Sequence, residues 1–451
     1  MNITSFDTST TIVAPATASG GATMVIRISG SQAVEVADKM FRGKQHIADM
    51  AGYTLQYGRI VNEAEETVDD VVVALFRAPH SYTGDDTVEV TIHGSEYICT
   101  EVIRLAICNG AQMAAAGEFT RRAFIAGKMD LSRAEAVADI IAADSRWSHQ
   151  VAATQMRGSY SERLSTLRGE LLRLCSLLEL ELDFSEEDVE FADRSELDAI
   201  LTRVDCEISQ LLSSFSLGNV LKNGVGVAIV GEPNVGKSTL LNRLIGDDCA
   251  MVSDIAGTTR DTIEATTTID GIRFRFIDTA GIRETDDRLE MMGIERTKNA
   301  ISKAHIILHL CSVDNPEFEQ IDITDNQHYI RVINKIDKLT SSNDTADTSA
   351  LHISAKEGVG IETLRERLRS TVDTSMLNSG SVVVSNMRHY AALREALSSL
   401  NDARRALHSG IPTDLLSEDV RSILLHLGTI TGEVTSDDIL HSIFSNFCIG
   451  K

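Results

Sequence analysis

The first part of the chain contains three short runs in which apolar and polar positions partly alternate. These runs are rich in β-branched residues and cover residues 23–30, 69–76 and 87–94. Alternation over such a length, closed in two of the runs by Gly, is typical of strands. We therefore expect a sheet in the first 118 residues, accompanied by short helices.

From about residue 117 the apolar positions recur at a spacing of three and four, which predicts helices. Two such runs, 133–143 and 163–184, are followed by an acidic break at 185–193 and another helical run to about residue 217. The helical pattern returns at residue 386 and continues to the end of the chain. We therefore expect a helical domain that is built from two separate segments.

Between these segments, from about residue 219 to residue 371, strand-like and helix-like runs alternate, as they do in a doubly wound sheet. The strand-like runs are VGVAIVG, IRFRFID, HIILHLCSV and YIRVINK. The chain is thus predicted to be a multidomain protein of α/β and α parts. The expected divisions are residues 1–118, 119–218, 219–378 and 379–451.

Composition places the chain among ordinary globular proteins, with 43% hydrophobic and 24% charged residues. No stretch approaches the roughly 18 uninterrupted apolar residues that span a bilayer, and the first residues lack the features of a secretory signal. The seven cysteines are scattered and show no C-x-x-C spacing. These features predict a cytoplasmic protein with no membrane segment, no zinc site and no disulfide framework.

The formal net charge is −24, and each of the four regions carries more acidic than basic residues. Because neutralisation of phosphates drives most nucleic-acid affinity, this balance argues against strong nucleic-acid binding by the chain alone. If the substrate is RNA, we expect a basic partner to provide much of the binding surface.

The segment GEPNVGKS at 231–238 matches the phosphate-loop pattern G-x-x-x-x-G-K-[ST]. It follows a predicted strand and opens a predicted helix, which is the context that this motif requires. Glycines let backbone N–H groups surround phosphate oxygens, and the start of a helix adds positive potential. We expect Lys237 to contact the β- and γ-phosphates and Ser238 to bind Mg²⁺. A chance Gly-rich turn is the alternative.

Further motifs follow in the order of a GTP-binding domain. IAGTTRD at 255–261 carries Thr259, the expected second Mg²⁺ ligand, and DTAG at 278–281 belongs beside Mg²⁺ and the γ-phosphate. NKID at 334–337 suits the guanine edge, whose N1–H and N2–H₂ groups need a carboxylate acceptor, and SAK at 354–356 lies one strand later. The predicted GTP contacts are Asn234, Val235, Gly236, Lys237, Ser238, Thr239, Ser253, Asp254, Ile255, Ala256, Gly257, Thr258, Thr259, Asp278, Thr279, Ala280, Gly281, Asn334, Lys335, Asp337, Ser354, Ala355 and Lys356.

The residue directly after DTAG is Ile282, where Ras-type enzymes place a Gln that orients the attacking water. An Ile side chain forms no hydrogen bond, and no residue stands out as an arginine finger. Hydrolysis therefore needs a cation and a water-orienting group from elsewhere. Asn234 offers a neutral oxygen beside the phosphates for a monovalent cation, and the carbonyl groups of 252–259 offer further ligands. The alternative is that Asn234 only caps the loop.

Segments outside these motifs resemble the MnmE family of tRNA-modification GTPases over the whole chain. They are IRISG at 26–30, YTGDDTVEVTIHG at 82–94, GEFTRRAFIAGKMDLSRAEAVADII at 117–141 and ITGEVTSDDILHSIFSNFCIGK at 430–451. The resemblance implies an N-terminal α/β folate-binding-like domain, a discontinuous helical domain and an inserted Ras-like P-loop G domain. The chain departs from the family pattern at Ala116, at Ser95 and in the loop 16–24.

Members of this family hydrolyse GTP as G-domain dimers that K⁺ activates, so the resemblance implies a homodimer. The family's water-orienting Glu falls on Glu290, which would fill the role that Ile282 cannot. The alternative for Glu290 is a solvated carboxylate. The K⁺ ligands of the family fall on Asn234, Ser253, Ile255 and Thr258.

The resemblance also implies that the N-terminal domain dimerises and binds 5-formyl- or 5,10-methylene-tetrahydrofolate as a one-carbon donor. The contact positions fall on Arg27, Glu89, Lys128 and, at the end of the chain, Lys451. Arg and Lys suit carboxylates or a formyl oxygen, and a carboxylate suits the N–H donors of a pterin. Without the family context these residues would be ordinary strand-end charges. A Cys that is the fourth residue from the end of a chain can mark a lipidation site. The resemblance instead implies that Cys448 lies beside the one-carbon chemistry, which argues against lipidation.

In this family the GTPase acts on tRNA with an FAD-containing partner, MnmG (GidA), in a heterotetramer or larger assembly. The resemblance implies addition of an aminomethyl or carboxymethylaminomethyl group to C5 of the wobble uridine, with GTP turnover driving a conformational step. One rival hypothesis is a ribosome-assembly GTPase, but the sequence shows neither a KH domain nor a second G domain. Another is a folate-dependent aminomethyltransferase that uses neither RNA nor a flavin partner. Nucleoside analysis of tRNA separates the three.

Overall fold

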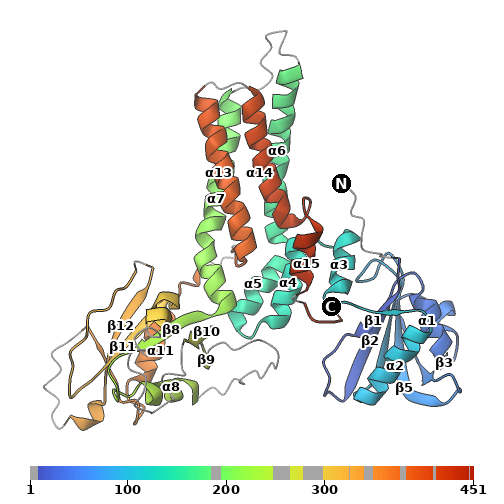
Figure 1. Ribbon diagram of the computed structural model, residues 1–451, viewed down its shortest axis with the longest axis horizontal. Helices are drawn as coiled ribbons and strands as arrows, with labels where there is room; N and C mark the ends of the chain where they lie inside the picture. Colours follow the sequence, from blue (N-terminus) through green and yellow to red (C-terminus); the bar gives the residue numbers. More distant parts are fainter. Residues whose placement is uncertain are drawn as a thin grey trace. The chain divides into compact units, whose positions relative to one another are not determined.

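The computed structural model describes residues 9–183, 194–246, 265–277, 298–324, 326–339, 349–375, 382–409, 413–445 and 447–450. The chain divides into two compact units. The first comprises Met1–Ala138, Gln155–Ala192 and Ile411–Lys451, and the second comprises Asp139–Thr154 and Asp193–Gly410. Figure 1 shows the elements of both units.

The described residues of the first unit form a seven-stranded sheet in the order β3-β4-β5-β6-β2-β1-β7. Neighbouring strands are antiparallel, except that β1 and β7 are parallel. Apolar residues of the sheet share one core with helices α1 (Ala33–Met40) and α2 (Glu96–Cys108). The strands are β1 (Ile12–Pro15), β2 (Thr23–Ser29), β3 (Phe41–Gly43), β4 (Thr54–Val61), β5 (Thr67–Phe76), β6 (Thr87–His93) and β7 (Gln112–Met113).

The helices that follow in the first unit are joined by apolar contacts. Long helix α6 (Ser159–Asp183) packs along α14 (Thr413–Thr431), and α3 (Glu118–Ile125) lies near α15 (Asp437–Phe444). Helix α4 (Leu131–Ala142) begins in this unit and ends in the second. Buried Leu131, Phe444 and Phe447 form one cluster that fastens the C-terminal end of the chain to α4.

The described residues of the second unit form a six-stranded sheet in the order β13-β12-β11-β8-β10-β9. Neighbouring strands are parallel, except that β9 and β10 form an antiparallel hairpin at one edge. Every residue of β8 and β11 is buried, as expected for central strands of a parallel sheet. The strands are β8 (Val225–Val230), β9 (Ala265–Ile269), β10 (Ile272–Phe276), β11 (Ile306–Ser312), β12 (His328–Asn334) and β13 (Leu351–His352).

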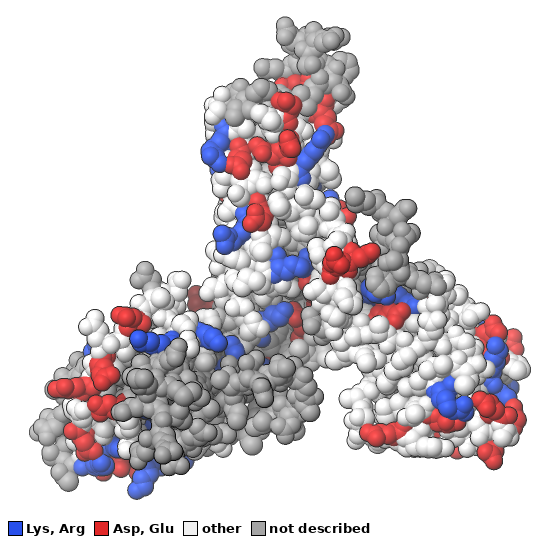
Figure 2. Space-filling view, viewed as in Figure 1, with Lys and Arg blue, Asp and Glu red and all other residues white. Residues whose placement is uncertain are grey.

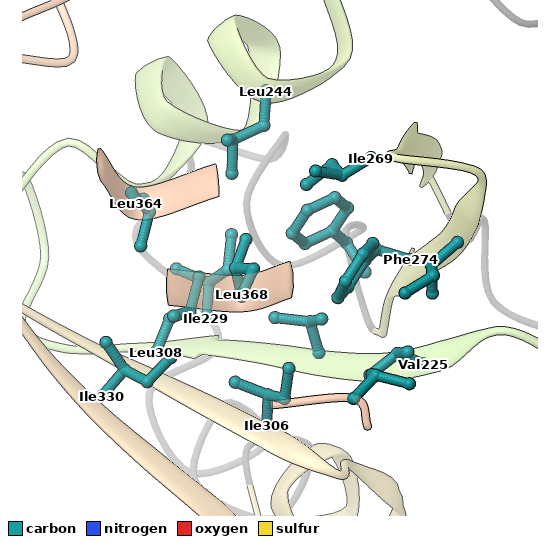
Figure 3. Close-up of a cluster of buried hydrophobic side chains, with 14 of the residues drawn as sticks. Val225, Ile229, Leu244, Ile269, Phe274, Ile306, Leu308, Ile330, Leu364 and Leu368 are labelled. Carbon is teal, nitrogen blue, oxygen red and sulfur yellow. The ribbon is translucent and has the colours of Figure 1, made fainter. Parts of the chain in front are cut away.

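Two helices, α8 (Lys237–Gly246) and α11 (Ile361–Ser370), contribute apolar side chains to the core of this sheet. Leu244 of α8 and Leu364 and Leu368 of α11 gather with Phe274 and the strand residues (Figure 3). Helices α7 (Arg194–Asn223) and α13 (Met387–His408) pack along each other, and the rings of Phe215 and Tyr390 stack with their centroids 4.3 Å apart.

The predicted α/β and α organisation is confirmed. The three early strand predictions correspond to β2, β5 and β6, and the four later ones to β8, β10, β11 and β12. The helical runs predicted at 133–143 and 163–184 correspond to α4 and α6. Among the helices of the described residues, none is long and apolar enough to cross a membrane.

Two expectations about element limits are wrong. Helix α7 continues to Asn223, past the expected change near residue 219, because its apolar positions keep a helical spacing. The last residues are not helical: α15 ends at Phe444, and Ile449 forms an isolated β-bridge with Ala116.

Candidate functional site

The predicted phosphate loop connects the end of β8 to the start of α8. A Cβ at Gly231 (φ +141°) would lie 2.1 Å from the carbonyl oxygen of Leu310, and one at Gly236 (φ +100°) would lie 2.3 Å from the amide nitrogen of Asn334. Only glycine permits both the positive φ and these close approaches. Asn234 also has a positive φ of +62°. The loop is therefore bent tightly over the N-terminus of α8, where anions bind.

Lys237 is the first residue of α8, and its side chain folds back over the loop. Nζ donates hydrogen bonds to the carbonyl oxygens of Gly231 (2.6 Å) and Glu232 (2.8 Å). Burial lowers the pKa of Lys237 from its ordinary value. No carboxylate is among its partners in the described part of the chain. An ammonium group held only by carbonyl oxygens is well suited to exchange them for phosphate oxygens.

Asn334, at the end of β12, connects the phosphate loop to the last of the predicted motifs. Its side chain is 2% exposed; Nδ2 donates to the carbonyl oxygen of Val235 (2.8 Å), and Oδ1 accepts from the backbone N–H of Ala355 (2.9 Å). Lys335 (φ +68°) adds a second link, because its Nζ donates to the carbonyl oxygen of Asn234 (2.5 Å). Three motifs that are distant in sequence therefore meet at one edge of the sheet.

Asp337 and Ser354 form the part of the site that was predicted to recognise guanine. The Ser354 hydroxyl donates to Oδ1 of Asp337 over 2.5 Å, and this hydrogen bond is the main reason that the pKa of the Asp337 carboxyl is lowered. Ser354 is fully buried, and its backbone N–H donates to the carbonyl oxygen of Val359 (2.9 Å). Asp337 itself is exposed. An exposed carboxylate that stays ionised suits the N1–H and N2–H₂ donors of guanine.

The structure thus brings together the predicted contacts at 234–237, 334–337 and 354–355. Ser238 and Thr239 follow Lys237 in α8, and both are exposed. Lys356 is exposed beyond Ala355, near Glu357 (3.7 Å). The predicted residues that lie outside the described part of the chain are Ser253, Asp254, Ile255, Ala256, Gly257, Thr258, Thr259, Asp278, Thr279, Ala280, Gly281 and Glu290.

A second polar site lies on the sheet of the first unit, around Arg27. The register of β2 and β6 places Arg27 opposite Glu89, and its Nε and one terminal nitrogen both lie 2.8 Å from Glu89 Oε1. The guanidinium lies 5.4 Å from the ring centroid of Tyr82 and 5.5 Å from that of Phe119. Burial raises the pKa of the Tyr82 hydroxyl, which hydrogen-bonds Thr120. Charge, carboxylate and rings together suit a planar polar ligand.

Lys128 borders the same region. Its Nζ donates to the carbonyl oxygen of Pro79, and its Cε would lie 3.5 Å from a Cβ at Gly84. The segment 79–84 also carries Tyr82, so Lys128 and Arg27 contact the same stretch of chain.

The C-terminal tail ends beside this second site. The backbone N–H of Gly117 donates to the carbonyl oxygen of Cys448 (3.4 Å), and the carbonyl oxygen of Gly450 accepts from Arg27 (3.4 Å). Cys448 is exposed. Lys451, the fourth predicted folate contact, lies outside the described residues. The tail therefore reaches the residues predicted to bind folate.

Sequence reasoning missed several residues at the two sites. Tyr82 and Phe119 lie in the segments 82–94 and 117–141, which carry the family resemblance. An aromatic residue in the same segment as a predicted ligand was a usable signal. Glu232 contacts the amide of Asn315 at the border of the phosphate loop (3.4 Å). No sequence signal pointed to Asn315, because it follows β11 in a connection without a motif.

The parallel sheet, the phosphate loop and the guanine-side motifs define a P-loop GTP-binding protein. A family model described as "MnmE helical domain" matches residues 131–448, and one described as "GTP-binding protein TrmE N-terminus" matches residues 11–128. The chain therefore belongs to the MnmE family. Both the predicted resemblance and the predicted fold class are confirmed by these matches.

Curated relatives match over almost their whole length. The tRNA modification GTPase MnmE of Bacteroides fragilis is 47% identical over 462 residues, which cover 98% of this chain and 99% of the relative. The protein of the same name from Flavobacterium johnsoniae is 46% identical over 461 residues, with the same coverage. Among solved structures, Era in complex with MgGDPNP and part of 16S ribosomal RNA is 29% identical with a TM-score of 0.26, covering 39% of this chain and 66% of that one.

Proposed function

We propose that this protein is a GTP hydrolase that acts in tRNA modification, as its family relatives are named to do. The observation that carries the proposal is the convergence of three motifs on Asn334, which links the phosphate loop to the Ser354–Ala355 turn. The same turn supplies the hydroxyl that lowers the pKa of the Asp337 carboxyl. This arrangement can hold the triphosphate and the guanine base of one nucleotide together.

In the GTP-bound protein, Lys237 exchanges its two carbonyl partners for oxygens of the β- and γ-phosphates. Ser238 and Thr259 would hold Mg²⁺, which supplies charge neutralisation between the phosphates when it is bound. Asp337 accepts hydrogen bonds from the guanine edge, and the backbone of 354–356 borders the base. The described residues at these positions suit GTP, because the start of α8 favours an anion and Lys237 would add one ammonium group for the phosphates.

GTP hydrolysis by this chain needs substitutes for two groups, because Ile282 stands where Ras-type enzymes place a Gln and no residue stands out as an arginine finger. We propose that K⁺, held by Asn234, Ser253, Ile255 and Thr258, supplies positive charge beside the phosphates in a dimer of G domains. Glu290 would orient the water that Ile282 cannot bind. What supports this is the exposed position of Asn234 at the top of the phosphate loop, with its backbone turned to positive φ.

We also propose that the first unit binds 5-formyl- or 5,10-methylene-tetrahydrofolate through Arg27, Glu89, Lys128 and Lys451. Paired charges, flanking rings and a nearby chain terminus support it. We propose that an FAD-containing MnmG-like partner then cooperates to add an aminomethyl or carboxymethylaminomethyl group to C5 of the wobble uridine. The acidic chain fits an assembly in which that partner contributes much of the tRNA-binding surface.

The direct test is the steady-state GTPase rate in K⁺ and in Na⁺ for the wild type, Asn234→Ala and Glu290→Ala. We expect K⁺ to stimulate the wild type. Asn234→Ala should lose this stimulation while still binding GTP, and Glu290→Ala should be slow in both salts, by about 100-fold or more, as when one stabilising group is removed from an active site. Asn315→Ala is the matched control, because Asn315 contacts Glu232 at the border of the loop and is not one of the proposed K⁺ ligands, so this variant should keep the K⁺ response. Equal wild-type rates in both salts would exclude the cation mechanism.

A further inference from the structure

The segment Asp139–Thr154 belongs to the second unit, although the chain on both sides of it belongs to the first. This segment contains the end of α4 and most of α5 (Arg146–Met156). Its anchor is Trp147, which is 6% exposed and packs with Val151 into the core of the second sheet. Trp147 is also the single tryptophan of the chain.

Trp147 holds the turn of the β9–β10 hairpin. Asp270 (φ +49°) and Gly271 (φ +77°) form a two-residue turn with Ile269 opposite Ile272, as in a type I′ hairpin. The indole N–H of Trp147 donates to the carbonyl oxygen of Asp270 (3.2 Å), and its backbone N–H donates to that of Gly271 (3.3 Å). The start of α5 therefore closes on the turn through two hydrogen bonds.

The fit between the turn and α5 is close. A Cβ at Gly271 would lie 3.0 Å from the Cβ of Arg146 and 3.5 Å from a ring carbon of Trp147. The Arg146 guanidinium lies 5.4 Å from the centroid of the Trp147 ring. Two residues after Gly271, Arg273 of β10 forms an ion pair with Asp144.

The turn extends beyond the rest of the sheet. Strand β8 pairs with β10 only from Phe274 to Phe276, so Ile272 and Arg273 have no partner on β8, and β9 is the edge strand. The two hydrogen bonds of the turn come from Trp147, and its close neighbours are Arg146 and Trp147 at the start of α5. Beside α5, a cleft of about 210 Å³ is lined by Ser148, Ala152, Lys222, Arg273 and Ser385, among others. Within this lining, Lys222 forms an ion pair with Asp139 (2.7 Å), which is a further link between this segment and the second unit.

The opposite end of the hairpin leads into the nucleotide motifs. IAGTTRD precedes β9, and DTAG begins one residue after Ile277, whose backbone N–H donates to the carbonyl oxygen of Val227 (2.9 Å). A five-residue strand spans about 17 Å, so the hairpin reaches from the nucleotide edge of the sheet to α5. A paired two-stranded ribbon moves as one piece, and a displacement at one end is passed to the other.

We propose that Trp147 and Asp144 are positioning residues that couple the nucleotide state of the phosphate site to the helical segments. They fasten α5 to the far end of the hairpin that joins the two predicted nucleotide-contacting motifs. The chain on either side of this segment then carries the displacement toward the first unit. This inference rests on the proposed GTPase function, which supplies the two nucleotide states.

The test uses the full-length protein and the emission of its single tryptophan with GDP, and with a non-hydrolysable GTP analogue. The variants are Asp144→Asn, which removes the ion pair to Arg273, and Trp147→Phe, which keeps a smaller aromatic ring but removes the indole N–H donor. Asp205→Asn is the matched control, because Asp205 also forms a partly exposed ion pair, with Arg404 (2.9 Å), in the same unit. GTPase rate and wobble-uridine content of tRNA, in a strain that lacks the native gene, are measured for each.

We expect wild-type emission to differ between the two nucleotides and this difference to shrink in Asp144→Asn. Both variants should keep GTPase rates within about twofold of the wild type but modify at least about tenfold less tRNA per GTP, within the usual range of coupling energies. Asp205→Asn should behave as the wild type. Unchanged modification per GTP, a parallel loss of both activities, or identical emission in the two states would each overturn the inference. A wild type without GTPase activity would instead overturn the proposed function.

Discussion

The short side chain of Asn334 donates one hydrogen bond and accepts another. Its amide nitrogen donates to the phosphate loop and its oxygen accepts from Ala355, while the side chain is 2% exposed. An Asp at this position could not donate, and Asn334→Leu would leave both partners unsatisfied at a cost of about 1–3 kcal/mol each. The motif NKID predicted an Asn at the guanine side, but its role as the junction of three motifs depends on tertiary contacts that sequence order does not specify.

Replacing Asp337 with Asn tests directly whether the Asp337 carboxylate recognises guanine. The carboxylate accepts from two donors of the base, and an amide presents a donor in place of one acceptor. We expect Asp337→Asn to weaken GTP binding by about 3 kcal/mol or more, roughly 100-fold or more, and to improve binding of xanthosine triphosphate, whose ring carries an acceptor at that position. Titration with fluorescent nucleotides measures both affinities.

Asp314→Asn is the control for this change. Asp314 also carries a carboxylate at the same edge of the sheet, but it is paired with Lys338 over 2.5 Å. The Asp314→Asn variant should therefore keep the nucleotide preference of the wild type. Unaltered GTP affinity in Asp337→Asn would contradict the assignment of this residue to the base.

Short buried strands and long amphipathic helices were the elements that could be predicted, because their apolar spacing is a local property. Strands β8 and β11 are apolar at almost every position, and α6 repeats its apolar residues over its whole length. Helix α5 and strand β9 were missed. Their sequences are mostly polar, and their positions depend on Trp147 and on pairing with β10. The C-terminal tail was predicted to be helical, but its pairing partner lies more than three hundred residues away in sequence.

The tail is an element whose backbone can be tested at one position. Gly450 has a φ of +98°, and a Cβ there would lie 1.9 Å from the carbonyl oxygen of Pro15. Gly450→Ala should therefore displace the tail from Arg27 and weaken binding of reduced folate by about tenfold or more, the loss of roughly one well-made charged hydrogen bond. Isothermal titration calorimetry with 5-formyl-tetrahydrofolate measures the effect.

Gly110→Ala is matched to this variant. Gly110 has a similar φ of +109°, but a Cβ there would meet nothing within 4 Å. Both substitutions impose the same kind of backbone strain, and only one disturbs the tail. Equal folate affinity in Gly450→Ala and the wild type would remove the tail from the proposed folate site.

The two units divide the proposed chemistry between them. The nucleotide site lies in the second unit, the Arg27 site lies in the first, and α4 passes from one to the other. On the described residues of the face drawn in Figure 2, acidic and basic side chains are interspersed and no continuous basic patch is visible. This pattern agrees with the net charge of −24 and with tRNA contacts that depend on a partner. The division into residues 1–118, 119–218, 219–378 and 379–451 stays a prediction.

The most direct test of the whole account is the wobble-uridine content of tRNA, measured by mass spectrometry of nucleosides. A strain without the native gene would carry the wild type, Lys237→Ala, or Arg27→Ala. We expect the C5 modification to be restored by the wild type and by neither variant, since one should lack nucleotide turnover and the other the one-carbon site. Full restoration by Arg27→Ala, with GTPase activity intact, would contradict the coupling of the two sites.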